Sequence, residues 1–354
     1  MNPMRPLFLL CLCFFLACLP PLAGLQTTVQ TAAPGLTTAT EWFQRAGERL
    51  ELRMQGSAPF HMKVVFHAFP GMEFLGPKEK SEIVAGDGAY EETWLSPHKW
   101  RREVTLSSYH AVEEESEGVR RMQASSDYEP SRVLMLLDAL LVPIPRNFFS
   151  EEFRHEGASG WKVDQVSNAN LSLVRVSKTV GSERGDLTDA FYFLPQGMLV
   201  IRNFRGLVTE WTSAVLFSGK VVPRHLSIKA GERELLAANI SIEAAGPVAL
   251  AKLDALVGPA EPGMTLRPFH DFEVRMPDLT FSHAWANVGN SGPGRAFSLW
   301  EVLDRHGRYR EVELILVVNK NDADTIMTFM REERHHPAEI DGSPCELAVS
   351  WGFR

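Results

Sequence analysis

The sequence predicts an α+β fold, with a curved antiparallel half-barrel sheet and two helices, followed by a small ββαβ unit. Three observations support this prediction. Hydrophobic residues alternate with polar ones over much of residues 60–125 and 152–245, and a period of two is typical of half-buried strands. Residues 39–50 and 130–141 have apolar positions at helical spacing. Near the C-terminus, residues 299–353 show two strand patterns, a helix and a last strand.

Length and composition limit the possible functions. The chain has 354 residues, more than one ordinary core requires, so two domains are expected. Hydrophobic residues make up 45% and charged residues 23%, as in globular proteins. The formal net charge of -8 is spread along the chain. Because nucleic-acid binding requires clustered lysine and arginine, the composition argues against a nucleic-acid partner and against an anionic membrane surface.

The first 24 residues have the features of a signal peptide. Arg5 supplies a positive charge, an apolar run covers residues 7–19, and a proline pair beginning at Pro20 ends the run before small residues. The run is short for a membrane span, and it is apolar on every side, which disfavours a buried amphipathic helix. Cleavage is expected after Ala23 or Gly24. The mature protein is therefore predicted to be exported to the periplasm.

Lipid anchoring at Cys18 is an alternative to simple export. Residues 16–18 (LAC) are similar to a lipoprotein processing site, although Phe15 stands where an aliphatic residue is usual. Beyond the leader, no stretch approaches the roughly 20 apolar residues that a spanning helix requires. We therefore expect the mature chain to be soluble.

The cysteines agree with export but exclude a disulfide framework. Cys11, Cys13 and Cys18 lie in the leader, so cleavage after Gly24 would leave Cys345 alone. No activating partner is evident beside this thiol. Cys345 is therefore predicted to be a core or strand residue and not a nucleophile.

The predicted first domain begins with a helix and continues as an antiparallel meander. Thr38 and Glu41 have the spacing of a capping box before the helix. The strands expected next are 60–68, 88–95, 101–112 and 118–125. The acidic run 113–117 is interpreted as a solvated hairpin tip. Further on, residues 208–217 are predicted as one strand that carries Trp211, Ser213, Val215 and Phe217 on one face.

The second predicted helix is the candidate ligand-binding element. Pro130 opens it, and Leu136, Leu137 and Leu140 belong to one broad apolar stripe. Two helices against a curved sheet can enclose an apolar space. The stripe either covers a ligand cavity or fills the core, and the pattern alone leaves both interpretations open.

These residues carry a family resemblance. The segment 59–141, with residues 88–103 (GAYEETWLSPHKWRRE) at its centre, resembles the LolA/LolB-like half-barrel of bacterial lipoprotein-sorting proteins. The resemblance extends over residues 36–245 through element order and composition. It implies a cavity for a lipid or acyl ligand between sheet and helices, with the Leu-rich helix as its lid or plug.

The C-terminal residues carry a second resemblance. Gly and Pro interrupt residues 246–275, which are predicted as a linker. Residues 302–313 (VLDRHGRYREVE), then 336–338 (HPA) and 341–344 (DGSP), resemble the C-terminal domain of TonB-type energy transducers. A helix capped by Asp322 separates the two parts, with Ala323, Ile326, Met327 and Met330 on one face.

The TonB resemblance implies a partner, although the match has departures. The Tyr-Pro that usually opens such domains is missing near Met276, and loss of the leader would remove an inner-membrane anchor. The resemblance implies that the last strand, 345–353, recruits an extended peptide of an envelope protein. The candidate partner-binding residues on this strand are Cys345, Ala348, Ser350 and Gly352.

No motif for catalysis, cofactor binding or metal binding is present. The sequence has no G-x-S-x-G elbow, no P-loop, no H-E-x-x-H and no paired Cys ligands. The histidine pairs His61/His67 and His335/His336 lack the convergent ligands that a metal requires. We therefore predict no enzyme activity, no cofactor and no metal.

The sequence thus predicts four segments and a binding function. They are a signal peptide (1–24), a LolA-like domain (25–245), a linker (246–275) and a TonB-like domain (276–354). The predicted function is a periplasmic, non-enzymatic binding or envelope-trafficking protein that holds an apolar ligand and contacts a partner. The alternative is an energy transducer or envelope scaffold with a purely structural half-barrel. A third class, an enzyme of unknown chemistry, would need a motif-free site of Glu, Asp and Tyr side chains.

Overall fold

The computed structural model describes most of the chain after residue 37. The described residues are 38–71, 73–74, 85–116, 118–126, 129–150, 153, 159–168, 171–180, 187–204, 206–254, 264–267, 297–316, 320–332, 334–340, 343–345 and 347–353. The predicted leader, residues 1–24, lies outside them. No helix in the described part of the chain is long and apolar enough to span a membrane.

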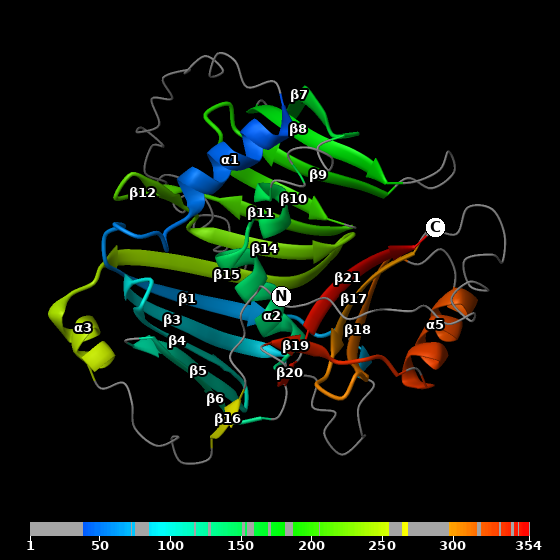
Figure 1. Cartoon of the computed structure of the whole chain (residues 1–354). Helices are drawn as coiled ribbons and strands as arrows, with labels where there is room; N and C mark the ends of the chain where they lie inside the picture. Colours follow the sequence, from blue (N-terminus) through cyan, green and yellow to red (C-terminus); the bar gives the residue numbers. More distant parts are fainter. Residues whose placement is uncertain are drawn as a thin grey trace, which may run out of the picture.

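The dominant element is a 13-stranded antiparallel sheet, so the predicted α+β class is confirmed. Its strand order is β16-β6-β5-β4-β3-β1-β15-β14-β11-β10-β9-β8-β7, an open order in which the two end strands do not pair (Figure 1). The strands are β1 (Phe60–Ala68), β3 (Gly86–Ser96), β4 (Lys99–Leu106), β5 (Tyr109–Ser116), β6 (Val119–Ala124), β7 (Lys162–Asn168), β8 (Leu171–Val180), β9 (Leu187–Phe193), β10 (Leu199–Phe204), β11 (Leu207–Thr212), β14 (His225–Ala230), β15 (Arg233–Ala244) and β16 (Thr265–Arg267).

The first helix forms as its capping box predicts. Helix α1 (Ala39–Leu50) begins after Thr38, whose hydroxyl accepts a hydrogen bond from the Glu41 backbone N–H at 3.3 Å. The Thr38 N–H in turn donates to the Glu41 carboxylate at 2.9 Å. This reciprocal arrangement satisfies two free backbone donors. Trp42 and Phe43 lie on the buried face of α1, against aromatic side chains of the sheet.

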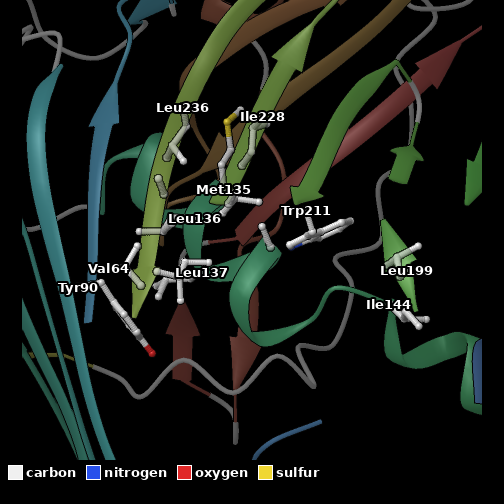
Figure 2. Close-up of a cluster of buried hydrophobic side chains, with 14 of the residues drawn as sticks. Val64, Tyr90, Met135, Leu136, Leu137, Ile144, Leu199, Trp211, Ile228 and Leu236 are labelled. Atoms are coloured by element: carbon white, nitrogen blue, oxygen red, sulfur yellow. The ribbon is translucent and has the colours of Figure 1, made fainter. Parts of the chain in front are cut away.

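Helix α2 (Ser131–Leu141) lies on the same face of the large sheet as α1 (Figure 1). It is followed by the short 3-10 helix η2 (Arg146–Phe149). Figure 2 shows side chains of α2 among residues from the inner face of the sheet. Three α2 side chains at this contact, Met135, Leu136 and Leu137, are at most 5% exposed. Residues of the sheet in the same cluster are Val64, Tyr90, Trp211, Ile228 and Leu236.

A second, 4-stranded sheet lies beside the first (Figure 1). Its order is β2-β18-β17-β21, from β2 (Glu73–Phe74), β18 (Tyr309–Leu316), β17 (Phe297–Leu303) and β21 (Leu347–Phe353). Helix α5 (Lys320–Glu332) follows β18, and the hairpin β19 (Ala338–Ile340) and β20 (Ser343–Cys345) precedes β21. The predicted ββαβ order is present. Strand β2 comes from the connection between β1 and β3, so the N-terminal half contributes one strand to the C-terminal sheet.

Two predicted strands are each divided by a serine with a left-handed backbone. The predicted strand 101–112 splits into β4 and β5 at Ser107, whose φ is 51°. The predicted strand 208–217 ends at Thr212, and Ser213 has a φ of 54° before the hairpin β12 (Val215–Phe217) and β13 (Lys220–Val222). The prediction that Trp211 to Phe217 share one strand face is therefore wrong. Non-glycine residues rarely adopt this backbone conformation, so the sequence gives little warning of it.

The acidic run of β5 is buried, which corrects the prediction of a solvated hairpin tip. Glu113, Glu114 and Glu115 are at most 7% exposed. Each carboxylate lies near an arginine of a neighbouring strand, with Arg102 at 3.6 Å, Arg121 at 2.8 Å and Arg120 at 2.9 Å respectively. Glu117, the last residue of the run, lies outside the described residues. Pairing across strands therefore neutralises a charge run that looks unpaired along the chain.

The C-terminal elements differ from prediction at their ends. Helix α5 begins at Lys320, so Asp322 lies within its first turn instead of capping it. Ile326, Met327 and Met330 are buried on its inner face, as predicted. The predicted last strand, 345–353, is two strands, because β20 ends at Cys345 and β21 begins at Leu347.

The predicted linker, 246–275, contains two described elements attached to the large sheet. Helix α3 (Pro247–Asp254) buries Leu253, and Lys252 forms an ion pair of 2.7 Å with Glu91 on β3. Strand β16 pairs with β6. The bounds of the two predicted domains stay a prediction.

A buried ion cluster joins α2 to both sheets. Nη2 of Arg132, near the start of α2, donates to the Glu313 carboxylate of β18 at 3.0 Å, and Arg233 of β15 forms an ion pair with the same carboxylate. Glu313 is fully buried and Arg132 is 3% exposed at its side chain. Burial raises the pKa of Glu313, and the two arginines oppose this shift. The neighbouring Glu311 accepts a hydrogen bond from the Ser131 backbone N–H at 3.3 Å.

We predict that Glu313→Gln destabilises the protein by about 3–5 kcal/mol, because it removes the ion-pair partner of the buried Arg132 and leaves this charge to the weaker influence of Glu311. Chemical denaturation at neutral pH measures the change. The control is Asp164→Asn, which removes the carboxylate of a half-exposed pair with Arg175 and should cost less than about 1 kcal/mol. Equal, small effects of the two substitutions would contradict this role for Glu313.

Candidate ligand cleft between the two helices

A cleft of about 420 Å³ lies between the C-terminal ends of α1 and α2. This volume falls in the range of about 300–1,000 Å³ that is usual for small-molecule sites. Apolar residues predominate in the lining, although polar atoms form nearly half of the exposed wall, and among the described lining residues only Glu51 and Arg53 carry charge. The lining residues are Gly47, Leu50, Glu51, Arg53, Leu140, Leu141, Val142, Pro143, Ile144 and Phe149.

The wall that α2 contributes is held in place by Arg202. The helix ends at Leu141, where two prolines, Pro143 and Pro145, prevent its continuation. Nη1 of Arg202 donates to the carbonyl oxygens of Val142 at 3.2 Å and Pro143 at 3.4 Å. Its Nη2 forms an ion pair with Asp138 one turn earlier. A cation at a helix C-terminus satisfies free carbonyl groups and complements the helix dipole.

Arg53 is the cationic group of the cleft, and it is tied to the sheet. Its Nε donates to the Glu92 carboxylate of β3 at 2.8 Å, and its Nη2 forms an ion pair with the same carboxylate. The Tyr90 hydroxyl donates to Glu92 at 2.9 Å. Burial by itself would raise the pKa of Glu92, but Arg53, Arg102 and the Tyr90 hydroxyl lower it overall. Glu92 is therefore a carboxylate at neutral pH, and its hydrogen bonds fix Arg53 at the edge of the cleft.

The three predicted ligand-site leucines do not lie together. Leu140 lines the cleft. Leu136 and Leu137 face the sheet and belong to the hydrophobic core (Figure 2). The structure therefore divides the predicted stripe into a core part and a cleft part, and a ligand for the cleft part stays a proposal.

Sequence reasoning missed Arg53, Glu92 and Arg202. A signal was available for two of them. Glu92 stands between Tyr90 and Trp94 at an inward position of its strand, and Arg202 is similarly buried in β10. A charged residue at an inward position requires a partner. Arg53 follows α1 in a segment without a periodic pattern, so nothing indicated its role.

The predicted partner strand lies at an edge of the second sheet. Strand β21 pairs with β17 on one side, with Ala348 opposite Val302, Ser350 opposite Trp300 and Gly352 opposite Ser298. Among the described strands, none pairs with its other side. Cys345 belongs to β20 and pairs with Ala338, so it does not lie on this edge strand.

Three of the four histidines in the two sequence pairs, His61, His67 and His335, lie within hydrogen-bond distance of polar side chains. His61 Nε2 lies 2.9 Å from Glu91, His67 Nδ1 lies 2.7 Å from Asp87, and His335 Nε2 lies 2.7 Å from the Tyr309 hydroxyl. Within the described ranges, no group of three or more His, Cys, Asp or Glu residues could hold a metal ion.

No family model and no curated protein matches this chain. Among solved structures, the chain is similar to a DUF1329 family protein from Desulfovibrio piger, with 6% identity and a TM-score of 0.29, over 59% of this chain and 92% of that protein. It is also similar to a LolA superfamily protein from Nitrosomonas europaea, with 10% identity and a TM-score of 0.26, over 59% of this chain and 94% of that protein. Similarity at this level identifies neither a ligand nor a partner. The TonB-like assignment of residues 276–354 stays a prediction.

Proposed function

We propose that this protein is a non-enzymatic binding protein of the bacterial envelope that holds the apolar part of a lipid or acyl ligand in the cleft between α1 and α2. The observation that supports the proposal is the cleft itself, with a volume of about 420 Å³ and a lining in which apolar residues predominate. Transfer of apolar surface from water to such a wall is worth about 25 cal/mol per Å². Export to the periplasm, as the N-terminal sequence predicts, is part of this proposal.

The second candidate function is an envelope scaffold or energy transducer whose half-barrel is purely structural. The observation that favours it is the burial of Leu136 and Leu137, at 0% and 5% exposure, in the core beneath α2. A helix packed in this way is an integral part of the core, and not a loosely held lid. Native mass spectrometry of protein purified from its own envelope separates the candidates, because a carrier would retain lipid and a scaffold would not.

In both candidates, the second sheet would contact an extended peptide of an envelope protein at β21. An edge strand offers backbone donors and acceptors that an added strand can satisfy. At the opposite edge, the two-residue strand β2 pairs with Glu311 and Val312 of β18. The longer edge strand, β21, is the proposed site of strand addition.

We predict that Leu140→Gln mainly weakens ligand binding, whereas Leu137→Gln mainly lowers the stability of the fold. Leu140→Gln should weaken the binding of a fluorescent apolar probe several-fold with a small loss of stability, because the amide can reach water in the cleft. Leu137→Gln should lower the stability by about 2–5 kcal/mol, because it places an amide in the core and leaves a packing defect. Probe titration and thermal denaturation of both variants measure the two effects.

The matched control is Leu171→Gln, because Leu171 is 56% exposed and does not line the cleft. It should change neither quantity. Unchanged probe binding in folded Leu140→Gln protein would count against a ligand in this cleft.

We also predict that an extended peptide from the periplasmic plug of an outer-membrane transporter binds along β21. In the full-length, isotope-labelled protein, amide shifts should concentrate in residues 347–353. Side-chain substitutions in the peptide should be tolerated, whereas a central proline should abolish binding because proline cannot donate to the ladder. Shifts that map to another surface, or equal binding of the proline peptide, would refute strand addition.

A further inference from the structure

The charged groups of the cleft restrict the chemistry of its ligand. Arg53 is the cation, but Nε and Nη2 of its guanidinium are both engaged by the buried carboxylate of Glu92. The pair carries no net charge. The side chain is also held against the Phe60 ring, with its central carbon 5.7 Å from the ring centre. Arg53 therefore does not act as an unpaired positive charge toward a ligand.

A second carboxylate makes this end of the cleft unfavourable for anions. Glu51 lines the cleft, and its side chain accepts a hydrogen bond from the Arg53 backbone N–H at 2.9 Å. The negative charge of Glu51 acts on the Arg53 guanidinium in the same direction as the charge of Glu92. The formal charges of Glu51, Arg53 and Glu92 sum to one negative charge. Arg102, whose charge also acts on Glu92, is itself paired with Glu113 at 3.6 Å and does not change this sum. An anionic ligand group would therefore meet repulsion as well as the cost of leaving water.

The Arg53 guanidinium nevertheless has one nitrogen, Nη1, that Glu92 does not engage. Among the described residues, Nη1 of Arg53 has no hydrogen-bond partner, while Nε and Nη2 are both bonded to Glu92. Arginine cannot deprotonate at physiological pH, so Nη1 always presents N–H groups and never a lone pair. The group that matches this donor is an uncharged acceptor oxygen.

We infer that the cleft selects an uncharged acyl ester or amide, with its chain against the apolar wall and its carbonyl oxygen accepting a hydrogen bond from Nη1 of Arg53, and that it discriminates against the free fatty-acid anion. This inference rests on the proposed function and names the class of its ligand. An O-acyl group of a glycerolipid and an N-acyl group of a modified protein share this chemistry. Glu51 is the residue that sets the discrimination against the anion.

The test uses four ligands with the same ten-carbon chain, namely methyl decanoate, N-methyldecanamide, decanoate and decane. Each competes at pH 7 with a fluorescent apolar probe on the full-length protein. The ester or the amide should bind about tenfold more tightly than decane, because a hydrogen bond to a charged donor is gained. Decanoate should bind at least about tenfold more weakly than the better of the two carbonyl ligands. The ester and amide arms distinguish an O-acyl from an N-acyl source.

The decisive variant is Glu51→Gln, which keeps an acceptor for the Arg53 backbone N–H and removes the negative charge. It should increase the affinity for decanoate several-fold relative to the affinity for methyl decanoate. Asp164→Asn, which removes an equal charge at a residue of β7 that does not line the cleft, should leave both affinities unchanged.

The outcomes separate this inference from the proposed function. If decanoate binds as tightly as the ester in the natural sequence, or if Glu51→Gln does not alter their ratio, the inference is overturned while the apolar cleft stands. If none of the four ligands competes with the probe, the proposed function fails and this inference fails with it.

Discussion

Buried arginines fix helix α2 at both of its ends, and the other features of the molecule depend on this constraint. At the start of the helix, Arg132 pairs with Glu313 of the second sheet. At its end, Arg202 of the large sheet binds Asp138 and two carbonyl oxygens. A buried ion pair does not by itself make a protein more stable than well-packed apolar residues would, but it strongly penalises any arrangement that separates the partners. These contacts therefore favour one position of the helix relative to both sheets.

Two consequences follow for function. The middle of α2 fills the inner face of the large sheet, where Leu136 and Leu137 contribute to the core. The end of the helix stops short of filling the space beside α1, and the cleft lies there. A helix can in this way be part of the core along one segment and the wall of a binding site along another. The same helix also links the cleft to the sheet that carries the edge strand β21, through the contact between Arg132 and Glu313.

The sequence predicts the helices and most strands because their signals are local. The capping box at Thr38 and the period of two in β1 depend on neighbours within a few residues. Signals that depend on another strand were not accessible. The acidic run of β5 looks solvated until the register places an arginine beside each carboxylate. Likewise, Ser107 and Ser213 adopt a left-handed backbone conformation, which serine rarely adopts and which the sequence therefore does not predict.

The candidate site was predictable only in part, for a related reason. Apolar periodicity indicates which side of α2 faces inward, but not whether an inward residue meets a side chain or open space. Of the three predicted leucines, only Leu140 lines the cleft. The ion pair of Arg53 and Glu92 was not predicted from the sequence. Arg53 lies outside any periodic segment, and its partner, Glu92, is 39 residues further along the chain. To predict a long-range pair of this kind, the strand order must be known, and a single sequence does not provide it.

The fixed position of α2 is tested most directly by amide hydrogen exchange along the helix, with and without methyl decanoate. If the helix is fixed in the core and walls the cleft only at its end, the amides near Ser131 should be strongly protected in both states. Added protection should then be confined to residues 138–142. If the ligand instead lowers protection along the whole of α2, the helix is a displaceable lid, and its role as a fixed part of the core is contradicted.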